Sequence, residues 1–243
     1  MKTQEQRVTI PGAGVEIQAV VVEPVGPPSR CGVLCYTDIF QLTESTLRTA
    51  RRLAAQGFVV YLPEIYPREL AGVALEFDDA GKSAGLAAAA HTTPAEFDAD
   101  RAAVLAHLAA RDDLDTIAAV GFCLGGHLAF RAAFDPRVSA TVCFYPTGLH
   151  DGSLGADVAD TLERAAEIEG RLMVVFGSAD PHVPAPARLR MVDALYAAGH
   201  DDLELHVFQG GEHAFMRDVG ARHDPELTDR ALVEAVSFLR GRS

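Results

Sequence analysis

The sequence predicts an α/β fold, namely a mostly parallel, doubly wound sheet with helices on both faces. Short apolar runs alternate with helical segments along the chain, as in sheets whose parallel strands are joined by crossover helices. The 243 residues are 49% hydrophobic and 23% charged, which is typical of a packed globular protein. At this length we expect one domain spanning residues 1–243.

The first half of the chain is expected to open with a hairpin and then alternate. Residues 7–10 and 15–22 flank a Pro-Gly-Ala-Gly turn, which predicts that hairpin. Buried strands are expected at 31–36 and 58–62, separated by a helix over 42–56 that Gly57 ends. Residues 67–93 are rich in Gly and Ala, and we expect a less regular stretch there. A helix is expected from Pro94 to about residue 110, capped by Thr92 or Thr93.

The second half continues the same alternation without a repeat or a linker. Strands are expected at residues 116–120, 138–144, 172–176 and 203–208. Helices are expected at residues 124–134, 157–169, 186–198 and 225–239, and Gly199 ends the third of these. This order places every strand of the second half before a helix or after one, which favours a parallel sheet.

Charge and hydropathy exclude several classes of partner. The net charge is −13, from 21 basic and 34 acidic residues, and such a field repels phosphates, so we expect no nucleic-acid partner. No apolar run approaches the roughly 18 residues that span a bilayer, and we expect no membrane partner. The N-terminal residues are polar and lack the apolar stretch of a signal peptide, which predicts a cytoplasmic protein.

The cysteines and histidines do not form a metal-binding pattern. Cys31, Cys35 and Cys143 lie inside apolar, strand-like runs, where cysteine acts as a small buried hydrophobe. The cysteine spacings match no paired zinc motif, and no two histidines have the spacing of a helical metal site. We therefore expect neither a metal nor a cofactor.

Cys123 differs from the other three cysteines because of its neighbours. The run Gly121-Phe-Cys-Leu-Gly125 lies between a predicted strand and a predicted helix, which is the pattern of a nucleophile elbow with cysteine in the place of serine. The turn is so sharp that residues two positions either side must lack a Cβ atom. The helix N-terminus favours a thiolate at this position. The alternative is a buried structural cysteine.

An acid and a histidine follow Cys123 in the chain. Asp180 lies just past the strand at 172–176, and His213 lies in a Gly-rich loop after the last strand. The order nucleophile, acid, histidine is typical of the α/β-hydrolase fold. We expect Asp180 to orient His213, which takes or shares the thiol proton. Taken singly, Asp180 could be a turn or cap residue and His213 a loop histidine. His182 could line the same site.

Several segments together resemble the dienelactone hydrolase family, a cysteine-dependent branch of the α/β-hydrolases. The resemblance runs from about residue 7 to residue 240, and the elbow and the His-x-Phe-x-Arg segment are its specific parts. The matching stretches are Asp38-Ile-Phe, Arg51-Arg-Leu-Ala-Ala-Gln-Gly-Phe, Pro63-Glu-Ile-Tyr66, Gly121-Phe-Cys-Leu-Gly-Gly126, Asp180-Pro-His-Val-Pro184 and His213-Ala-Phe-Met-Arg217.

The resemblance implies roles for three further side chains. In the family a carboxylate after the third strand contacts the nucleophile, and Asp38 matches it, although glutamate is more common there. Arg217 matches an arginine that grips the carboxylate of the substrate, an interaction suited to a planar fork. The family also has an arginine and a tyrosine after the fourth strand, where residues 72–90 offer only Lys82. The alternatives are that Asp38 is a cap or turn residue before the helix that begins at Leu42, and that Arg217 is a surface arginine.

The resemblance and the triad predict a hydrolase that opens a small lactone or ester through a thioester intermediate. The backbone N–H groups of Leu124 and Ile39 are expected to form the oxyanion hole. We expect a small-molecule partner and a monomer or small homo-oligomer. Two alternatives stay open, which are a broad-specificity carboxylesterase or thioesterase and a non-catalytic binding member of the fold.

Overall fold

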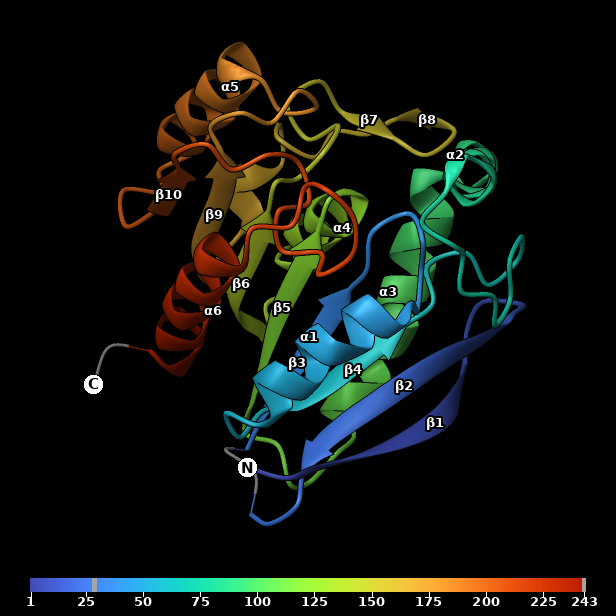
Figure 1. Ribbon diagram of the computed structural model, residues 1–243. Helices are drawn as coiled ribbons and strands as arrows, with labels where there is room; N and C mark the ends of the chain where they lie inside the picture. Colours follow the sequence, from blue (N-terminus) through green and yellow to red (C-terminus); the bar gives the residue numbers. More distant parts are fainter. Residues whose placement is uncertain (28–29, 242–243) are drawn as a thin grey trace.

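An eight-stranded sheet forms the centre of the molecule (Figure 1). The computed structural model describes residues 1–27 and 30–241. In these residues the strand order is β1-β2-β4-β3-β5-β6-β9-β10. The strands are β1 (Thr3–Pro11), β2 (Glu16–Pro24), β3 (Cys31–Tyr36), β4 (Val59–Pro63), β5 (Thr116–Phe122), β6 (Val138–Phe144), β9 (Arg171–Gly177) and β10 (Glu204–Phe208).

Most of this sheet is parallel, as the sequence predicts. The strands from β4 to β10 in the sheet order pair in parallel. The predicted hairpin is also present: β1 pairs antiparallel with β2, which pairs antiparallel with β4. Because the parallel strands share one direction, the loops that follow them meet at one edge of the sheet.

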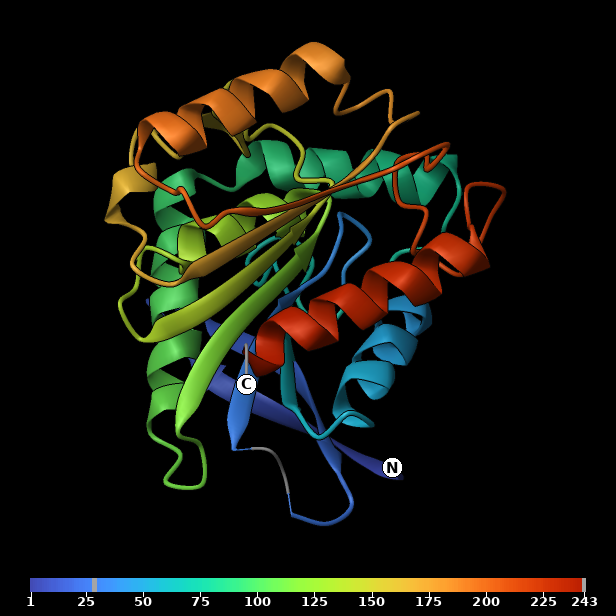
Figure 2. The same ribbon diagram turned by 90° about the vertical axis from the view of Figure 1, so that its left-hand side faces the viewer.

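Helices cover both faces of the sheet (Figure 2). On one face lie α1 (Glu44–Ala54) and α6 (Pro225–Arg240), and on the other lie α3 (Pro94–Ala109), α4 (Leu124–Ala132) and α5 (Ala185–Ala197). Strand residues alternate between the two cores, as the pleat requires. In β2, Ile17 and Val21 pack with the core under α3, α4 and α5, whereas Val20 and Val22 pack with the core under α1 and α6.

The less regular stretch predicted for residues 67–93 contains a helix, α2 (Asp79–His91). The Asp78 side chain caps it by accepting from the Gly81 N–H at 2.7 Å. Its glycines permit close packing, because a Cβ atom on Gly85 would lie 2.4 Å from the carbonyl oxygen of Ile39. This helix was not predicted because its Ala and Gly residues give no apolar stripe.

The helix predicted for residues 157–169 is wrong. Residues Asp157–Val158 form β8, which pairs with β7 (Ser153–Leu154), and the only helical turn in this range is η1 (Ala165–Glu167), a 3₁₀-helix. Thr161 explains the difference. Its buried hydroxyl lies 2.7 Å from Nε2 of His127 and 2.9 Å from Nη1 of Arg131. These tertiary hydrogen bonds override the local helical preference.

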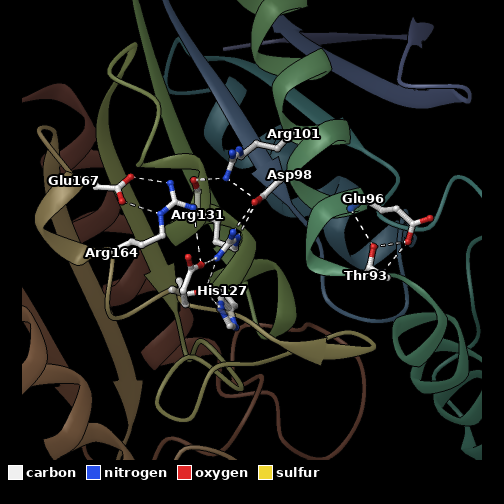
Figure 3. A network of polar contacts seen from close by, with 10 residues as sticks. Thr93, Glu96, Asp98, Arg101, His127, Arg131, Arg164 and Glu167 are labelled. Atoms are coloured by element: carbon white, nitrogen blue, oxygen red, sulfur yellow. Dashed lines mark hydrogen bonds and ion pairs between the residues drawn. The ribbon is translucent and has the colours of Figure 1, made fainter.

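The network around Thr161 joins α3 to α4 on the face of the sheet that these two helices cover. Figure 3 shows His127 and Arg131 among its side chains, with Asp98 reaching Arg131 from α3. Burial lowers the pKa of His127 to about 3, so this imidazole is neutral and works as a hydrogen-bonding group. It also contacts the backbone oxygen of Thr147 at 3.2 Å.

No helix among residues 1–27 and 30–241 is both long enough and apolar enough to cross a bilayer.

Replacing Thr161 with Val should destabilise the protein by about 2 kcal/mol. The variant lacks the hydroxyl, so the His127 imidazole and the Arg131 guanidinium each lose a buried hydrogen bond. Urea unfolding measures this change. Thr9→Val is the control, since the Thr9 hydroxyl bonds Gln18 at an exposed position. Equal stability losses in the two variants would contradict the assigned role of Thr161.

Candidate active site

The backbone at Cys123 turns sharply between β5 and α4. Cys123 has φ 58° and ψ −121°, a conformation that residues with a side chain rarely adopt. A Cβ atom on Gly121 would lie 1.8 Å from the Gly125 oxygen, and one on Gly125 would lie 2.2 Å from the Thr37 oxygen. Both glycines are therefore required by close backbone approach, as the elbow pattern predicts.

Cys123 is the one partly exposed cysteine of the four, all of which lie in the described chain. Its Sγ lies 3.7 Å from Oγ1 of Thr147. The other three thiols are buried, and burial raises the pKa of Cys35 to about 12 and raises that of Cys143. Only Cys123 therefore combines exposure with a position at the edge where loops meet.

Asp180 and His213 meet at this edge from the loops after β9 and β10. Oδ2 of Asp180 lies 2.8 Å from Nδ1 of His213, and both side chains are buried. Oδ1 of Asp180 accepts from the backbone N–H groups of His182 and Val183 at 2.8 and 3.1 Å. Both oxygens of the carboxylate thus accept hydrogen bonds that hold it in place.

The two loops are also tied to each other by their backbones. The N–H of Ala179 donates to the Gly211 oxygen at 3.0 Å. Gly177 approaches the same oxygen so closely that a Cβ atom on it would lie 2.2 Å away. The Asp180–His213 pair therefore lies on two loops that a backbone hydrogen bond and close packing join.

The site favours a charged imidazole. Burial opposes protonation of His213, but the negative charge of Cys123 and hydrogen bonds with Asp180 and Cys123 outweigh it and raise the pKa of His213 to about 9. Burial likewise favours the neutral form of Asp180, yet the hydrogen bond and charge of His213 hold its pKa below the ordinary value. The arrangement is thus a buried carboxylate next to an imidazole whose protonated form is favoured.

Asp38 and Arg217 lie together beside this site. Oδ2 of Asp38 is 3.5 Å from Nη1 of Arg217, and Oδ1 accepts from the Phe40 N–H at 3.0 Å. Burial raises the pKa of Asp38, against the effects of these two partners. Within the described residues no hydrogen bond joins Asp38 to Cys123. The Arg217 guanidinium lies over the rings of Phe40 and Phe77, 5.2 and 4.7 Å from their centres.

The two backbone N–H groups predicted for the oxyanion hole, those of Ile39 and Leu124, have no protein acceptor among residues 1–27 and 30–241. Ile39 follows β3, and Leu124 is the first residue of α4. Lys82 is exposed on α2, and its positive charge helps to lower the pKa of His182, although burial is the larger cause. No hydrogen bond or ion pair in the described chain joins Lys82 to Cys123 or His213.

Three further side chains lie near Cys123 or His213, and of these the sequence suggested only His182, as a residue that could line the site. The His182 ring lies 4.6 Å from the His213 ring, centre to centre, and the Tyr145 ring lies 5.2 Å away. Thr147 approaches the thiol as described above. Tyr145 and Thr147 both follow β6. Their position after a parallel strand, at the carboxyl edge of the sheet, is the one feature of the sequence that could have placed them near the site.

One group in the described chain has side chains that could hold a metal ion. The ligand atoms of Glu204, His206 and Glu234 lie within 4.8 Å of one another on β10 and α6. Nε2 of His206 already contacts Glu204 at 3.0 Å. A groove also lies between the C-terminal end of α1 and α6, and none of the predicted site residues lines it.

Comparisons with known proteins point to one family. A sequence profile described as the dienelactone hydrolase family matches residues 17–243. A Saccharomyces cerevisiae protein named "Putative carboxymethylenebutenolidase" is 34% identical over 209 residues, covering 83% of this chain and 76% of that protein. The carboxymethylenebutenolidase of a Pseudomonas species is 27% identical over 212 residues, covering 86% of this chain and 83% of that protein.

The fold is shared with a solved structure. The crystal structure of a dienelactone hydrolase-like promiscuous phosphotriesterase from metagenomic libraries has a TM-score of 0.80 to this chain. The two chains are 21% identical, and the match covers 98% of each.

Gly125→Ala should destabilise the protein by at least about 4 kcal/mol, because the added Cβ atom meets two backbone oxygens that cannot move away cheaply. Gly199→Ala is the matched control. Gly199 has positive φ but open space around it, so only about 1 kcal/mol is expected there. Thermal or urea unfolding measures both, and a Gly125→Ala protein as stable as the control would contradict the packing described.

His213→Gln should remove a pH-dependent part of the stability. The pKa of His213 in the folded protein, about 9, lies above its ordinary 6.5, so folding binds a proton. This contribution is complete below about pH 6.5 and is lost as the pH rises through about 9. The stability difference from the unsubstituted protein should therefore be larger at pH 6 than at pH 9.5. His91→Gln, at an exposed position, is the control. A difference that grows with pH would refute this.

Proposed function

The chain belongs to the dienelactone hydrolase family and is a carboxylic-ester hydrolase, and from this premise we propose that Cys123 is its nucleophile. In this proposal Cys123, His213 and Asp180 form a triad that opens a small lactone or ester. One observation carries it: the partly exposed thiol at a strained bend interacts with a buried imidazole that a buried carboxylate orients.

The first half of the reaction forms a thioester. The Cys123 thiolate attacks the carbonyl carbon, a C–S bond forms, and the carbonyl oxygen becomes an oxyanion. The free N–H groups of Ile39 and Leu124 are the donors proposed to bind it. The C–O bond to the leaving group then breaks, and the leaving oxygen takes the proton of the His213 imidazolium. In a lactone that oxygen stays attached to the acyl group.

The second half of the reaction depends on a change in the charge of His213. The negative charge of Cys123 is one reason for the raised pKa of His213, and acylation removes that charge. Burial then favours the neutral imidazole, which can take a proton from water. The hydroxide attacks the thioester, the C–S bond breaks, and the thiolate returns. Asp180 holds the ring in the same orientation throughout.

Arg217 is the residue proposed to bind a carboxylate on the substrate. Its Nε is buried and has no hydrogen-bond partner in the described chain. A buried donor without a partner is unfavourable by about 1–3 kcal/mol, and a bound carboxylate would relieve this. This supports a lactone with a carboxylate group, of the carboxymethylenebutenolidase type, as the substrate class.

A second candidate is a broad-specificity carboxylesterase or thioesterase. Asp38 already neutralises much of the Arg217 charge at 3.5 Å, and Lys82 lies on the exposed surface of α2 with no hydrogen bond or ion pair to the triad in the described chain. The Asp38 carboxylate reduces the positive potential that Arg217 offers to an anionic substrate. Under this alternative uncharged esters are the better substrates.

Cys123→Ala should reduce hydrolysis of dienelactone and p-nitrophenyl acetate by at least about 10³-fold, because the alanine cannot form the thioester. Cys35→Ala is the matched control, since that thiol is buried and its pKa is raised to about 12. Turnover by purified variants is the measurement. A Cys123→Ala enzyme with full activity would reject the proposed nucleophile.

Arg217→Met should change substrate preference more than it changes activity overall. We expect the ratio of kcat/KM for a carboxylate-bearing lactone to that for a neutral aryl ester to fall by at least about tenfold, the value of one charge-assisted hydrogen bond. Taking the ratio cancels effects common to both substrates, and the unpaired Asp38 adds to the fall because its charge repels only the carboxylate-bearing lactone. An unchanged ratio would favour the broad carboxylesterase.

A further inference from the structure

Gln41 occupies an unusual place in the loop that follows β3. We call residues 37–42 the oxyanion loop, because they include Asp38 and the proposed donor Ile39. Gln41 is fully buried and has φ 63°, which a residue with a side chain adopts only under constraint. A buried polar side chain in a strained conformation requires an explanation, and its hydrogen bonds give one.

The carboxamide of Gln41 makes every hydrogen bond available to it. Its Nε2 donates to the backbone oxygens of Leu70 and Val73, both at 2.9 Å. Its Oε1 accepts from the backbone N–H groups of Ile65 and Tyr66, both at 3.1 Å. Two donors and two acceptor directions are thus all satisfied, and their chemistry fixes the orientation of the amide. The four partners belong to residues 64–73, which follow β4.

The backbone of Gln41 acts on the proposed oxyanion donor directly. Its N–H donates to the Asp38 oxygen at 3.1 Å, and the Thr37 hydroxyl donates to the same oxygen at 3.1 Å. That oxygen and the N–H of Ile39 belong to one planar trans peptide, in which they point in opposite directions. Fixing the Asp38 oxygen therefore fixes the direction of the Ile39 N–H.

The other side of the oxyanion loop is held by residues 75–85. The Leu75 N–H donates to the Phe40 oxygen at 3.0 Å, and the rings of Phe40 and Phe77 lie 4.8 Å apart. Gly85 of α2 packs against the Ile39 oxygen, as noted above. With these contacts in place, the Gln41 side chain is the link between the loop and residues 64–73.

We propose that Gln41 is the positioning residue that sets the orientation of the Ile39 N–H, by clamping the oxyanion loop to residues 64–73. This rests on the proposed function. Gln41 does not touch the reacting atoms. Its loss should slow the step that creates an oxyanion and leave the thiol itself as reactive as before.

Two reactions of Cys123 separate these effects. Acylation by p-nitrophenyl acetate creates an oxyanion, whereas alkylation by iodoacetamide displaces iodide at a saturated carbon and needs no oxyanion hole. Gln41→Gly is the main variant, since glycine adopts φ 63° without strain but has no side chain. We expect its acylation rate to fall about 10²-fold, with KM changed by less than about threefold and alkylation unchanged.

Two further variants complete the test. Gln41→Glu keeps the shape and the acceptor but loses the donors to Leu70 and Val73, so the ratio of acylation to alkylation should fall here too. Glu64→Gln is the matched control. Glu64 is buried and accepts from the Gly72 N–H at 2.5 Å in the same segment, with no hydrogen bond to the oxyanion loop. Its ratio should stay near that of the unsubstituted enzyme. Circular dichroism checks the fold of each variant.

The possible results are distinguishable. The proposal is overturned by an unchanged ratio in both Gln41 variants, by an equal fall in Glu64→Gln, or by a parallel loss of acylation and alkylation. Failure of both Gln41 variants to fold would assign Gln41 to stability alone and also overturn it. Acylation that survives Cys123→Ala would instead contradict the proposed nucleophile, which is the premise rather than the role of Gln41.

Discussion

The strained backbone of Cys123 is the constraint on which the candidate site depends. Such a conformation is unfavourable by about 1–3 kcal/mol and persists only where the surroundings determine it. Here the Cys123 N–H donates to the Phe144 oxygen at 3.1 Å, and the Cys123 oxygen accepts from the N–H groups of Gly126 and Thr147 at 3.0 and 3.2 Å. These bonds hold the bend between β5 and α4. The bend brings the thiol to the edge of the sheet, where the loops after β3, β9 and β10 also lie.

The loops supply different parts of the site. The loop after β3 contributes Asp38 and the Ile39 N–H, and the loops after β9 and β10 contribute Asp180 and His213. A parallel sheet makes this division natural, because residues far apart in the chain follow strands that end at one edge. Burial opposes a positive charge on His213, and the interactions of His213 with Cys123 and Asp180 outweigh that effect and raise its pKa.

Much of this arrangement could be predicted from sequence, and the failures have physical causes. The elbow was predictable from sequence. Backbone contacts leave no room for a Cβ atom at Gly121 and Gly125, so the two glycines occur at a fixed spacing around Cys123. The helix predicted at 157–169 failed because Thr161 is bound by His127 and Arg131, residues on another element. Gln41 gave no signal at all. Its role depends on four backbone groups of a distant segment, which no local pattern reveals.

The central claim is that the sulfur of Cys123 carries the acyl group during turnover. Acid quenching of the enzyme during hydrolysis of p-nitrophenyl acetate, followed by peptide mapping with mass spectrometry, tests this directly. We expect an added acetyl group on the peptide that contains Cys123, in an amount that decays when substrate is exhausted. Two results would contradict this mechanism. One is an acetyl group on another residue, and the other is steady turnover with no acylated Cys123 at any quench time.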